Sequence, residues 1–216
     1  MSDSNKKKIK NPTIAIVDYG VGNLYSLKKA CLKFADKIEI TDDPIVIEKA
    51  DAVILPGVGS FQAGMDGLKK RGLIGAVKKI AASGKPVLGI CLGAQLMLER
   101  GYEFGEFKGL GIIPGKVVIF TKLNNAKIPQ IGWNKVKFSS NKNLFKSLKQ
   151  NPYLYFVHSY ILKPSERNSV LAETKYGNLT FCSAIKKGNI YGTQFHPEKS
   201  GEVGLKIISN FIKLAS

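Results

Sequence analysis

Long apolar runs are missing from this sequence of 216 residues. No stretch approaches the roughly 20 consecutive apolar residues that a membrane-spanning helix needs. Near the N-terminus, the lysine-rich segment 6–10 is followed by the polar Asn11 and by Pro12, not by the apolar core of a signal peptide. The sequence therefore predicts a cytoplasmic protein with no membrane partner.

Cysteine and histidine are also scarce, with three and two residues respectively. Cys31, Cys91 and Cys182 are odd in number and widely separated, so they provide neither a disulfide framework nor the paired spacing of a metal site. We expect reduced thiols, no metal and no cofactor.

Acidic residues are few, at 16 against 33 lysines and arginines, which gives a formal net charge of +17. A basic surface often binds phosphate groups, nucleic acid or an acidic partner. The lysines, however, are spread along the chain and are not interleaved with aromatic residues as in a nucleic-acid platform. We therefore expect no nucleic-acid partner, and a lysine-rich proteome is the simplest explanation. Residues 1–11 are predicted to be a basic, flexible tail.

The remaining composition is that of an ordinary globular domain, with 44% hydrophobic and 23% charged residues. In the first half, short apolar runs at 13–18, 52–55 and 86–90 alternate with longer amphipathic segments. This alternation is typical of βαβ units around a parallel sheet. The expected helices begin after the capping residue Asn23 and reach Phe34, span 68–80 with a break near Gly72, and cover 92–99.

Closely spaced β-type runs follow, and they are expected to be antiparallel additions or edge strands: 110–120, 134–138, 153–157, 169–174, 179–186 and 190–195. A final amphipathic helix that includes residues 203–211 closes the chain. We find no repeat, linker or domain boundary, so residues 12–216 are predicted to form one α/β domain.

The central motif is Gly89-Ile90-Cys91-Leu92-Gly93, between an apolar strand and a helix. It matches the G-x-nucleophile-x-G elbow, in which a tight turn lifts the nucleophile above the sheet and flanking glycines relieve crowding. A helix N-terminus directly beyond Cys91 favours the thiolate, which is the attacking species. The alternative, a buried and inert cysteine, fits Cys31 and Cys182 better.

A thiolate nucleophile needs a base that passes a proton to the leaving amine, and histidine is the usual choice near neutral pH. His196 follows a strand-like run and has Glu198 two residues on, near enough to orient its ring. His158 has no carboxylate nearby in the sequence. We predict His196 as the base with Glu198 as its partner; the alternative for Glu198 is a solvated surface carboxylate.

Acyl transfer also needs hydrogen-bond donors aimed at the developing oxyanion. The segment Pro56-Gly57-Val58-Gly59 ends a core strand and offers backbone amides for this purpose. Taken alone, however, such a segment is more often an ordinary turn at the end of a strand.

Four segments in this order together resemble the class I glutamine amidotransferases: Leu55–Phe61, Gly89–Gln95, Pro129–Asn134 and Gly192–Ser200. The elbow alone fits several hydrolases, and His-Pro-Glu fits most class I glutaminases. Pro-Gly-Val-Gly and Gly-Trp-Asn narrow the resemblance to glutaminase subunits of imidazole glycerol phosphate synthases, and it extends along nearly the whole chain, from residue 14 to residue 212. The implied fold is flavodoxin-like, with a central, mostly parallel sheet flanked by helices and antiparallel strands in the second half.

The resemblance implies a covalent mechanism. Cys91 attacks the side-chain amide of L-glutamine, His196 protonates the departing ammonia, and water hydrolyses the thioester. Backbone amides of Val58 and Leu92 would hold the oxyanion. By similarity, five residues would contact glutamine: Gly59, Gln95, Glu103, Ser159 and Tyr160. Three would lie toward the synthase partner: Asn23, Trp133 and Lys199, the last with a solvated surface lysine as its alternative.

The implied partner is a cyclase subunit of (β/α)₈ fold that forms a heterodimer with this chain. It would use the ammonia to make imidazole glycerol phosphate and AICAR in histidine biosynthesis. The alternative is a paralogous subunit that supplies ammonia for the modification of surface-polysaccharide sugars. The family commonly has Pro-His-Met-Gly-Trp-Asn where this chain has Pro-Gln-Ile-Gly-Trp-Asn at 129–134, so we expect the interface chemistry to differ.

Two other classes of function compete with this interpretation. A binding or regulatory subunit that keeps the fold without the chemistry is disfavoured by the complete set of Cys91, His196 and Glu198. A cysteine peptidase on a similar scaffold is disfavoured by Gln95 and the Pro-Gly-Val-Gly segment, which are typical of amidotransferases.

Overall fold

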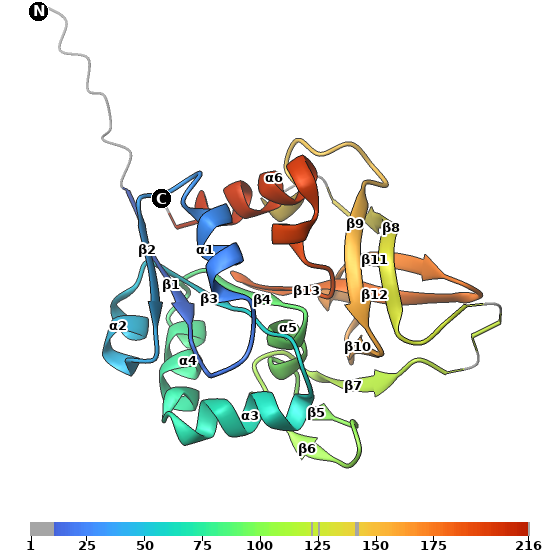
Figure 1. Ribbon diagram of the computed structural model, residues 1–216, viewed down its shortest axis with the longest axis horizontal. Helices are drawn as coiled ribbons and strands as arrows, with labels where there is room; N and C mark the ends of the chain where they lie inside the picture. The colour runs from blue at the N-terminus through green and yellow to red at the C-terminus, as the bar shows by residue number, and fades with distance from the viewer. Residues whose placement is uncertain (1–10, 122, 125, 141–142, 216) are drawn as a thin grey trace, which may run out of the picture.

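The computed structural model describes residues 11–121, 123–124, 126–140 and 143–215 (Figure 1). Thirteen strands in these ranges form one sheet, with helices on both faces of its first half. Of the predicted tail, residues 1–10 lie outside these ranges, and Asn11 donates a side-chain hydrogen bond to Asp36 at 2.7 Å. Within the described ranges no helix is long and apolar enough to cross a membrane.

Five parallel strands form the first half of the sheet, in the order β2-β1-β3-β4-β13. Their bounds are Thr13–Val17 (β1), Lys37–Thr41 (β2), Ala52–Leu55 (β3), Val87–Ile90 (β4) and Ile190–Thr193 (β13). The strands β3, β4 and β13 are buried along their whole length, as expected when both faces are covered. This is the flavodoxin-like strand order, in which ligands bind beyond the carboxyl ends of the strands.

Helices on the two faces of the parallel half enclose two hydrophobic cores. Their bounds are Leu24–Cys31 (α1), Pro44–Lys49 (α2), Phe61–Lys70 (α3), Leu73–Ala82 (α4), Leu92–Leu96 (α5) and Gly201–Ile212 (α6). Alternate residues of a strand point to opposite faces. Accordingly, Ile14 and Ile16 of β1 pack in one core with α1 and α6, whereas Ala15 and Val17 pack in the other with α2, α3 and α4.

The second half continues the sheet beyond β13, mainly through antiparallel pairs. The main path runs through β12 (Leu179–Lys187), β10 (Tyr160–Pro164), β7 (Gly115–Ile119), β5 (Arg100–Gly101) and β6 (Phe107–Lys108). A branch from β12 adds β11 (Val170–Tyr176), β8 (Gln130–Phe138) and β9 (Tyr153–His158). The branch returns to the parallel half, where His196 N–H donates to the Tyr155 carbonyl oxygen at 2.9 Å.

Most of the predicted elements are confirmed, and three differences concern strands and helices near the candidate site. The prediction of an antiparallel or edge strand at 190–195 is wrong for β13, which is central and parallel to β4. The helix predicted at 92–99 ends at Leu96, because the carbonyl oxygens of residues 96–98 accept hydrogen bonds from backbone N–H groups of residues 110–113. The predicted strand 110–120 is regular only at Gly115–Ile119 (β7). Its first residues, 110–113, instead form the hydrogen bonds to residues 96–98.

Other differences lie farther from the site. The first helix ends at Cys31, and Phe34, predicted to lie on its apolar face, is 40% exposed. The strand predicted at 134–138 begins earlier, at Gln130. Five strands and helices were not predicted at all: β2, α2, β5, β6 and β10.

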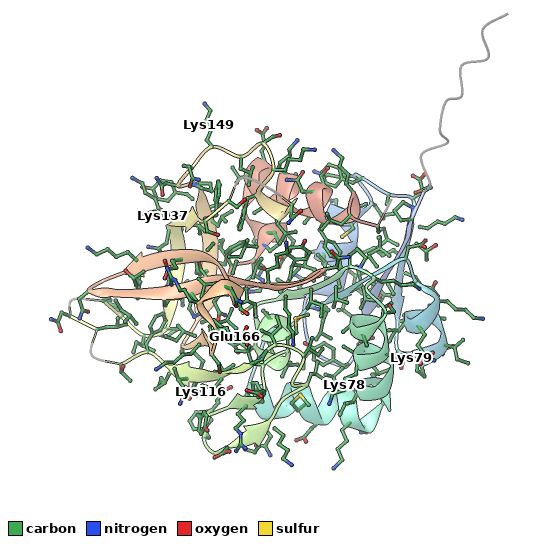
Figure 2. All side chains as sticks on the ribbon, turned by 180° about the vertical axis from the view of Figure 1, so that it is seen from behind. Lys78, Lys79, Lys116, Lys137, Lys149 and Glu166 are labelled. Atoms are coloured by element: carbon green, nitrogen blue, oxygen red, sulfur yellow. The ribbon has the colours of Figure 1, made fainter. Side chains whose placement is uncertain are left out.

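Basic side chains extend from many different elements of the fold. Figure 2 labels Lys78 and Lys79, which are neighbours on α4, together with Lys116 on β7, Lys137 on β8 and Lys149 ahead of β9, and the α4 pair lies well away from Lys137 and Lys149 across the view. The labelled lysines therefore do not form one basic stripe.

Candidate active site

Cys91 lies on the turn between β4 and α5, in a backbone conformation that residues other than glycine rarely adopt. Its φ is +51° and its ψ is −107°, a strained combination that costs on the order of 1–3 kcal/mol. Its N–H donates to the Thr193 carbonyl oxygen at 2.7 Å, which ties the turn to β13. This is the backbone shape expected of a nucleophile elbow.

The glycines on either side of Cys91 are required by close packing. A Cβ atom at Gly89 would lie 2.6 Å from the backbone nitrogen of Ala94, and one at Gly93 would overlap the carbonyl oxygen of Leu55. The elbow can therefore approach β3 and α5 only because both positions lack a side chain.

Gly93→Ala should lower the free energy of unfolding by at least about 2 kcal/mol, because the added methyl group must displace the backbone of β3. Gly75→Ala on α4 is the matched control, since a Cβ atom there meets nothing within 4 Å and alanine favours a helix. Urea unfolding followed by circular dichroism measures both variants. Equal loss of stability in the two would contradict the close packing described at Gly93.

His196 follows β13, whose carboxyl end lies beside that of β4, so the base and nucleophile predicted from sequence emerge at one edge of the sheet. Its Nδ1 lies 2.8 Å from Oε1 of Glu198, on the short 3₁₀-helix Pro197–Lys199. Burial lowers the pKa of His196, but interactions with Cys91 and Glu198 outweigh this and raise it to about 10. The raised pKa favours the protonated form of the ring.

His158, at the end of β9, lies in a different environment. Burial, with a smaller contribution from the nearby His196, lowers its pKa to about 4, although a hydrogen bond to the Tyr160 carbonyl oxygen opposes the shift. Nδ1 lies 2.8 Å from that oxygen. A ring that is neutral and bound in this way is a poor proton donor to a leaving group.

A pocket of about 380 Å³ opens above Cys91. Its lining includes all five residues predicted to contact glutamine: Gly59, Gln95, Glu103, Ser159 and Tyr160. Glu103 enters from the turn between β5 and β6, and its Oε2 accepts a hydrogen bond from the Phe61 N–H at 2.6 Å. The pocket therefore combines the Cys91 thiol, a fixed carboxylate and several polar groups, which suits a small polar substrate.

Gln194 is a residue near the nucleophile that the sequence motifs did not single out. It is fully buried, and its Nε2 donates to Sγ of Cys91 at 3.7 Å. Its Oε1 accepts a hydrogen bond from Nε2 of Gln95 at 3.2 Å. The available signal was a polar residue directly after an apolar strand and two positions before His196.

The two backbone amides predicted to hold an oxyanion do not converge in this structure. The Leu92 N–H donates to the Gly57 carbonyl oxygen at 3.4 Å. The Gly57 carbonyl and the Val58 N–H belong to one planar trans peptide and point in opposite directions. The Val58 N–H therefore points away from the Leu92 N–H, and the predicted pair of donors is not assembled.

Two of the residues predicted to face a partner meet around one tyrosine. Trp133 is 50% exposed, and its ring centroid lies 6.0 Å from that of Tyr155. The Nζ atom of Lys199 lies 5.9 Å from the centroid of the same ring, within the range of a cation–π contact. Tyr155, which the motifs also did not single out, thus links the two.

The third such residue, Asn23, caps α1 by accepting a hydrogen bond from the Ser26 N–H at 3.2 Å. Asn23 and Lys199 together line a narrow crevice that also contacts Gly57 and His196. The structure therefore places these two residues beside the backbone segment and the imidazole ring that the proposed chemistry uses.

Comparison with known proteins identifies the family of the chain. The family model for class-I glutamine amidotransferases matches residues 15–214. The chain is 49% identical to imidazole glycerol phosphate synthase subunit HisH 2 of Methanococcus maripaludis, over 94% of this chain and 100% of that protein. It is 47% identical to subunit HisH of Trichodesmium erythraeum, over 93% of this chain and 94% of that protein.

Solved structures share the fold at lower sequence identity. A glutamine amidotransferase superposes with a TM-score of 0.73 at 16% identity, covering 94% of this chain and 98% of that one. PurLQS from Thermotoga maritima gives a TM-score of 0.70 at 18% identity, with the same coverage of 94% and 98%. On the match of the family model and of the two HisH relatives, the chain belongs to the class-I glutamine amidotransferase family.

Proposed function

We propose that this chain is the glutaminase subunit of an imidazole glycerol phosphate synthase. It hydrolyses L-glutamine to glutamate and ammonia, and a cyclase subunit uses the ammonia to make imidazole glycerol phosphate and AICAR in histidine biosynthesis. One observation carries the chemical part of the proposal: Cys91, on a strained elbow beside the His196–Glu198 pair, opens into the pocket described above.

In the proposed mechanism, the Cys91 thiolate attacks the side-chain amide carbon of glutamine. His196, protonated through its raised pKa, gives a proton to the departing nitrogen, which leaves as ammonia. The ring, now neutral, takes a proton from the water that hydrolyses the thioester. Glu198 keeps the ring oriented through Nδ1 and stabilises its positive charge.

The proposed oxyanion hole requires the Gly57–Val58 peptide to turn over. In the present conformation the Leu92 N–H donates its hydrogen bond to the Gly57 carbonyl oxygen and is not available to a substrate. Rotation of this one peptide would release the Leu92 N–H and turn the Val58 N–H toward it, so that two donors face the carbonyl oxygen of the substrate. Gly59, with a φ of +111° and nothing within 4 Å of a Cβ position, has room to absorb the change.

We infer the pathway that uses the ammonia from the names of the related proteins. Those cited above are named as HisH subunits of imidazole glycerol phosphate synthase, which favours histidine biosynthesis over the modification of surface-polysaccharide sugars. The proposed partner is a cyclase of (β/α)₈ fold that binds as a heterodimer over Asn23, Trp133 and Lys199. The lyase activity belongs to this complex, and we propose that it works in the cytoplasm.

The purified chain alone should hydrolyse glutamine slowly, and a cyclase subunit with its bound nucleotide substrate should raise the rate by about 10²–10³-fold, the usual contribution of one oxyanion-hole donor. The physical reason is that the donors are assembled only after the peptide turns over. Glutamate release by the chain with and without the cyclase measures the effect. Full activity of the chain alone would contradict both the proposed requirement for a partner and the proposed rotation of the peptide.

Gly59→Ala and Gly59→Val test the rotation directly, because a side chain disfavours the backbone conformations that the turn needs. The ratio of the stimulated to the unstimulated rate should fall in both variants. Gly75→Ala, in the first turn of α4, is the matched glycine control and should keep full stimulation. Gly57→Ala is a harsher variant, since its Cβ atom would overlap the Tyr19 hydroxyl.

A further inference from the structure

We propose that Gln194 is a positioning residue that joins the nucleophile to the wall of the substrate pocket. Its side-chain amide lies between Sγ of Cys91 and the amide of Gln95, with one hydrogen bond to each. The inference deepens the proposed glutaminase function and rests on it for its catalytic consequence. The contacts themselves involve only groups of this chain.

The backbone holds Gln194 and Cys91 side by side although 103 residues separate them in sequence. Each directly follows one of two neighbouring parallel strands, β13 and β4, in which Thr193 is paired with Ile90. The Cys91 N–H is bonded to the Thr193 carbonyl oxygen at 2.7 Å, and the Gln194 N–H to the Ser183 carbonyl oxygen at 2.9 Å. Both side chains therefore start from fixed backbone positions.

Toward the sulfur, Gln194 acts as a hydrogen-bond donor. Its Nε2 lies 3.7 Å from Sγ, and Gln194 itself is fully buried. A donor directed at the sulfur stabilises the thiolate more than the neutral thiol. Gln194 thereby favours the attacking form of the nucleophile without itself taking a proton.

Toward the pocket, Gln194 acts as an acceptor and orients Gln95. Nε2 of Gln95 donates both to Oε1 of Gln194 at 3.2 Å and to the Tyr160 carbonyl oxygen at 3.1 Å. An amide nitrogen carries two hydrogens, so these two bonds use both of them. The carbonyl oxygen of Gln95 is then the end left to accept a hydrogen bond from an N–H group of the substrate.

Several titratable groups surround Cys91, and a variant at Gln194 leaves all of them in place. His196 and Glu198 follow β13, Tyr19 follows β1, and His158 ends β9. Three more, Glu103, Tyr160 and Lys199, line the pocket with Cys91. A change in the pH profile of Cys91 in Gln194→Met therefore reports on the lost amide, whereas Gln194→Glu also places a carboxylate beside the sulfur.

Two variants of the full chain separate the two hydrogen bonds. Gln194→Glu keeps an acceptor for Gln95 but, when ionised, has no donor for the sulfur. Gln194→Met has a similar length and removes both. Ser183→Ala is the control, because Ser183 is equally buried beside Gln194 and its hydroxyl has no hydrogen-bond partner among the described residues.

The first readout is alkylation of Cys91 by iodoacetamide as a function of pH, quantified for each cysteine by mass spectrometry. Alkylation at neutral pH should fall about tenfold in Gln194→Met, with the half-maximal rate displaced by about one unit to higher pH, as for the loss of one hydrogen bond to a charged group. In Gln194→Glu it should fall at least as far, because the carboxylate also repels the thiolate. The second readout is the KM for glutamine with the cyclase present. It should rise about tenfold in Gln194→Met and stay within about twofold in Gln194→Glu.

Wild-type alkylation profiles in both Gln194 variants would overturn the proposal, as would Ser183→Ala reproducing their effects. Gln194→Glu, which matches glutamine in size, serves as the test if Gln194→Met does not fold by circular dichroism. Alkylation requires no turnover. A wild-type chain without glutaminase activity would therefore overturn the proposed function while the alkylation profiles still decide the role of Gln194.

Discussion

Cys91→Ala should abolish glutamine hydrolysis by the cyclase-bound chain, with a loss of about four to six orders of magnitude. The substitution removes the only atom able to form the thioester in the proposed mechanism. It removes little from the core, because Sγ faces the pocket, so the free energy of unfolding should change by no more than about 1 kcal/mol. Glutamate release measures the first effect and urea unfolding the second. Cys91→Ser should be equally inactive.

The other two cysteines provide the controls. Burial raises the pKa of both Cys31 and Cys182 to about 12, so neither thiol ionises at neutral pH. Cys182→Ala should therefore keep its activity. Mass spectrometry of the chain trapped during turnover should find the glutamyl thioester on Cys91 alone. Glutaminase activity in Cys91→Ala would end the assignment of the nucleophile.

His196→Ala should lower the turnover number by about three to six orders of magnitude, since the leaving nitrogen then has no proton donor in place. Glu198→Ala should cost about tenfold to a hundredfold less, because Glu198 orients and stabilises the ring without taking the proton. Both variants are measured as glutamate release at saturating glutamine, with the cyclase present.

His158→Ala tests the alternative that His158 is the base, because His158 lines the pocket with Cys91. Its pKa of about 4 leaves it neutral, so its loss should be milder than either of the other two substitutions. A more damaging effect at His158 than at His196 would reverse the choice of base. An equal effect at both would indicate that the two rings share the proton transfer.

The parts of the site that could be predicted are those encoded by short segments. The turn at Gly89–Gly93 needs small residues beside the nucleophile for steric reasons, so it is readable without a structure. The same holds for β3 and β4, whose continuous apolar runs reflect burial on both faces. The pairing of His196 with Glu198 follows from their separation of two residues.

The parts that could not be predicted depend on which strands become neighbours. The run at 190–195 resembles the antiparallel strands before it, and only the sheet order makes β13 a central parallel strand. Gln194 acquires its contact with Cys91 from that placement. Likewise, β2 has alternating exposed positions and a short length, so its pattern is weak although it completes the parallel half. The direction of the Gly57 carbonyl is a matter of conformation, which residue types alone do not determine.

The position of β13 between β4 and β12 has a consequence for the synthesis of the protein in the cell. The ribosome makes Cys91 well before the segment that carries Gln194 and His196, and 103 residues separate Cys91 from Gln194. At about 5–20 residues per second, the nascent chain spends roughly 5–20 seconds with the proposed nucleophile made and the proposed proton donor absent. During that interval β4 is an unpaired edge on the side that β13 later fills, open to chaperones and to wrong pairing. Insertion of this strand closes the edge and completes the chemical machinery in one event, so an incomplete chain cannot consume glutamine.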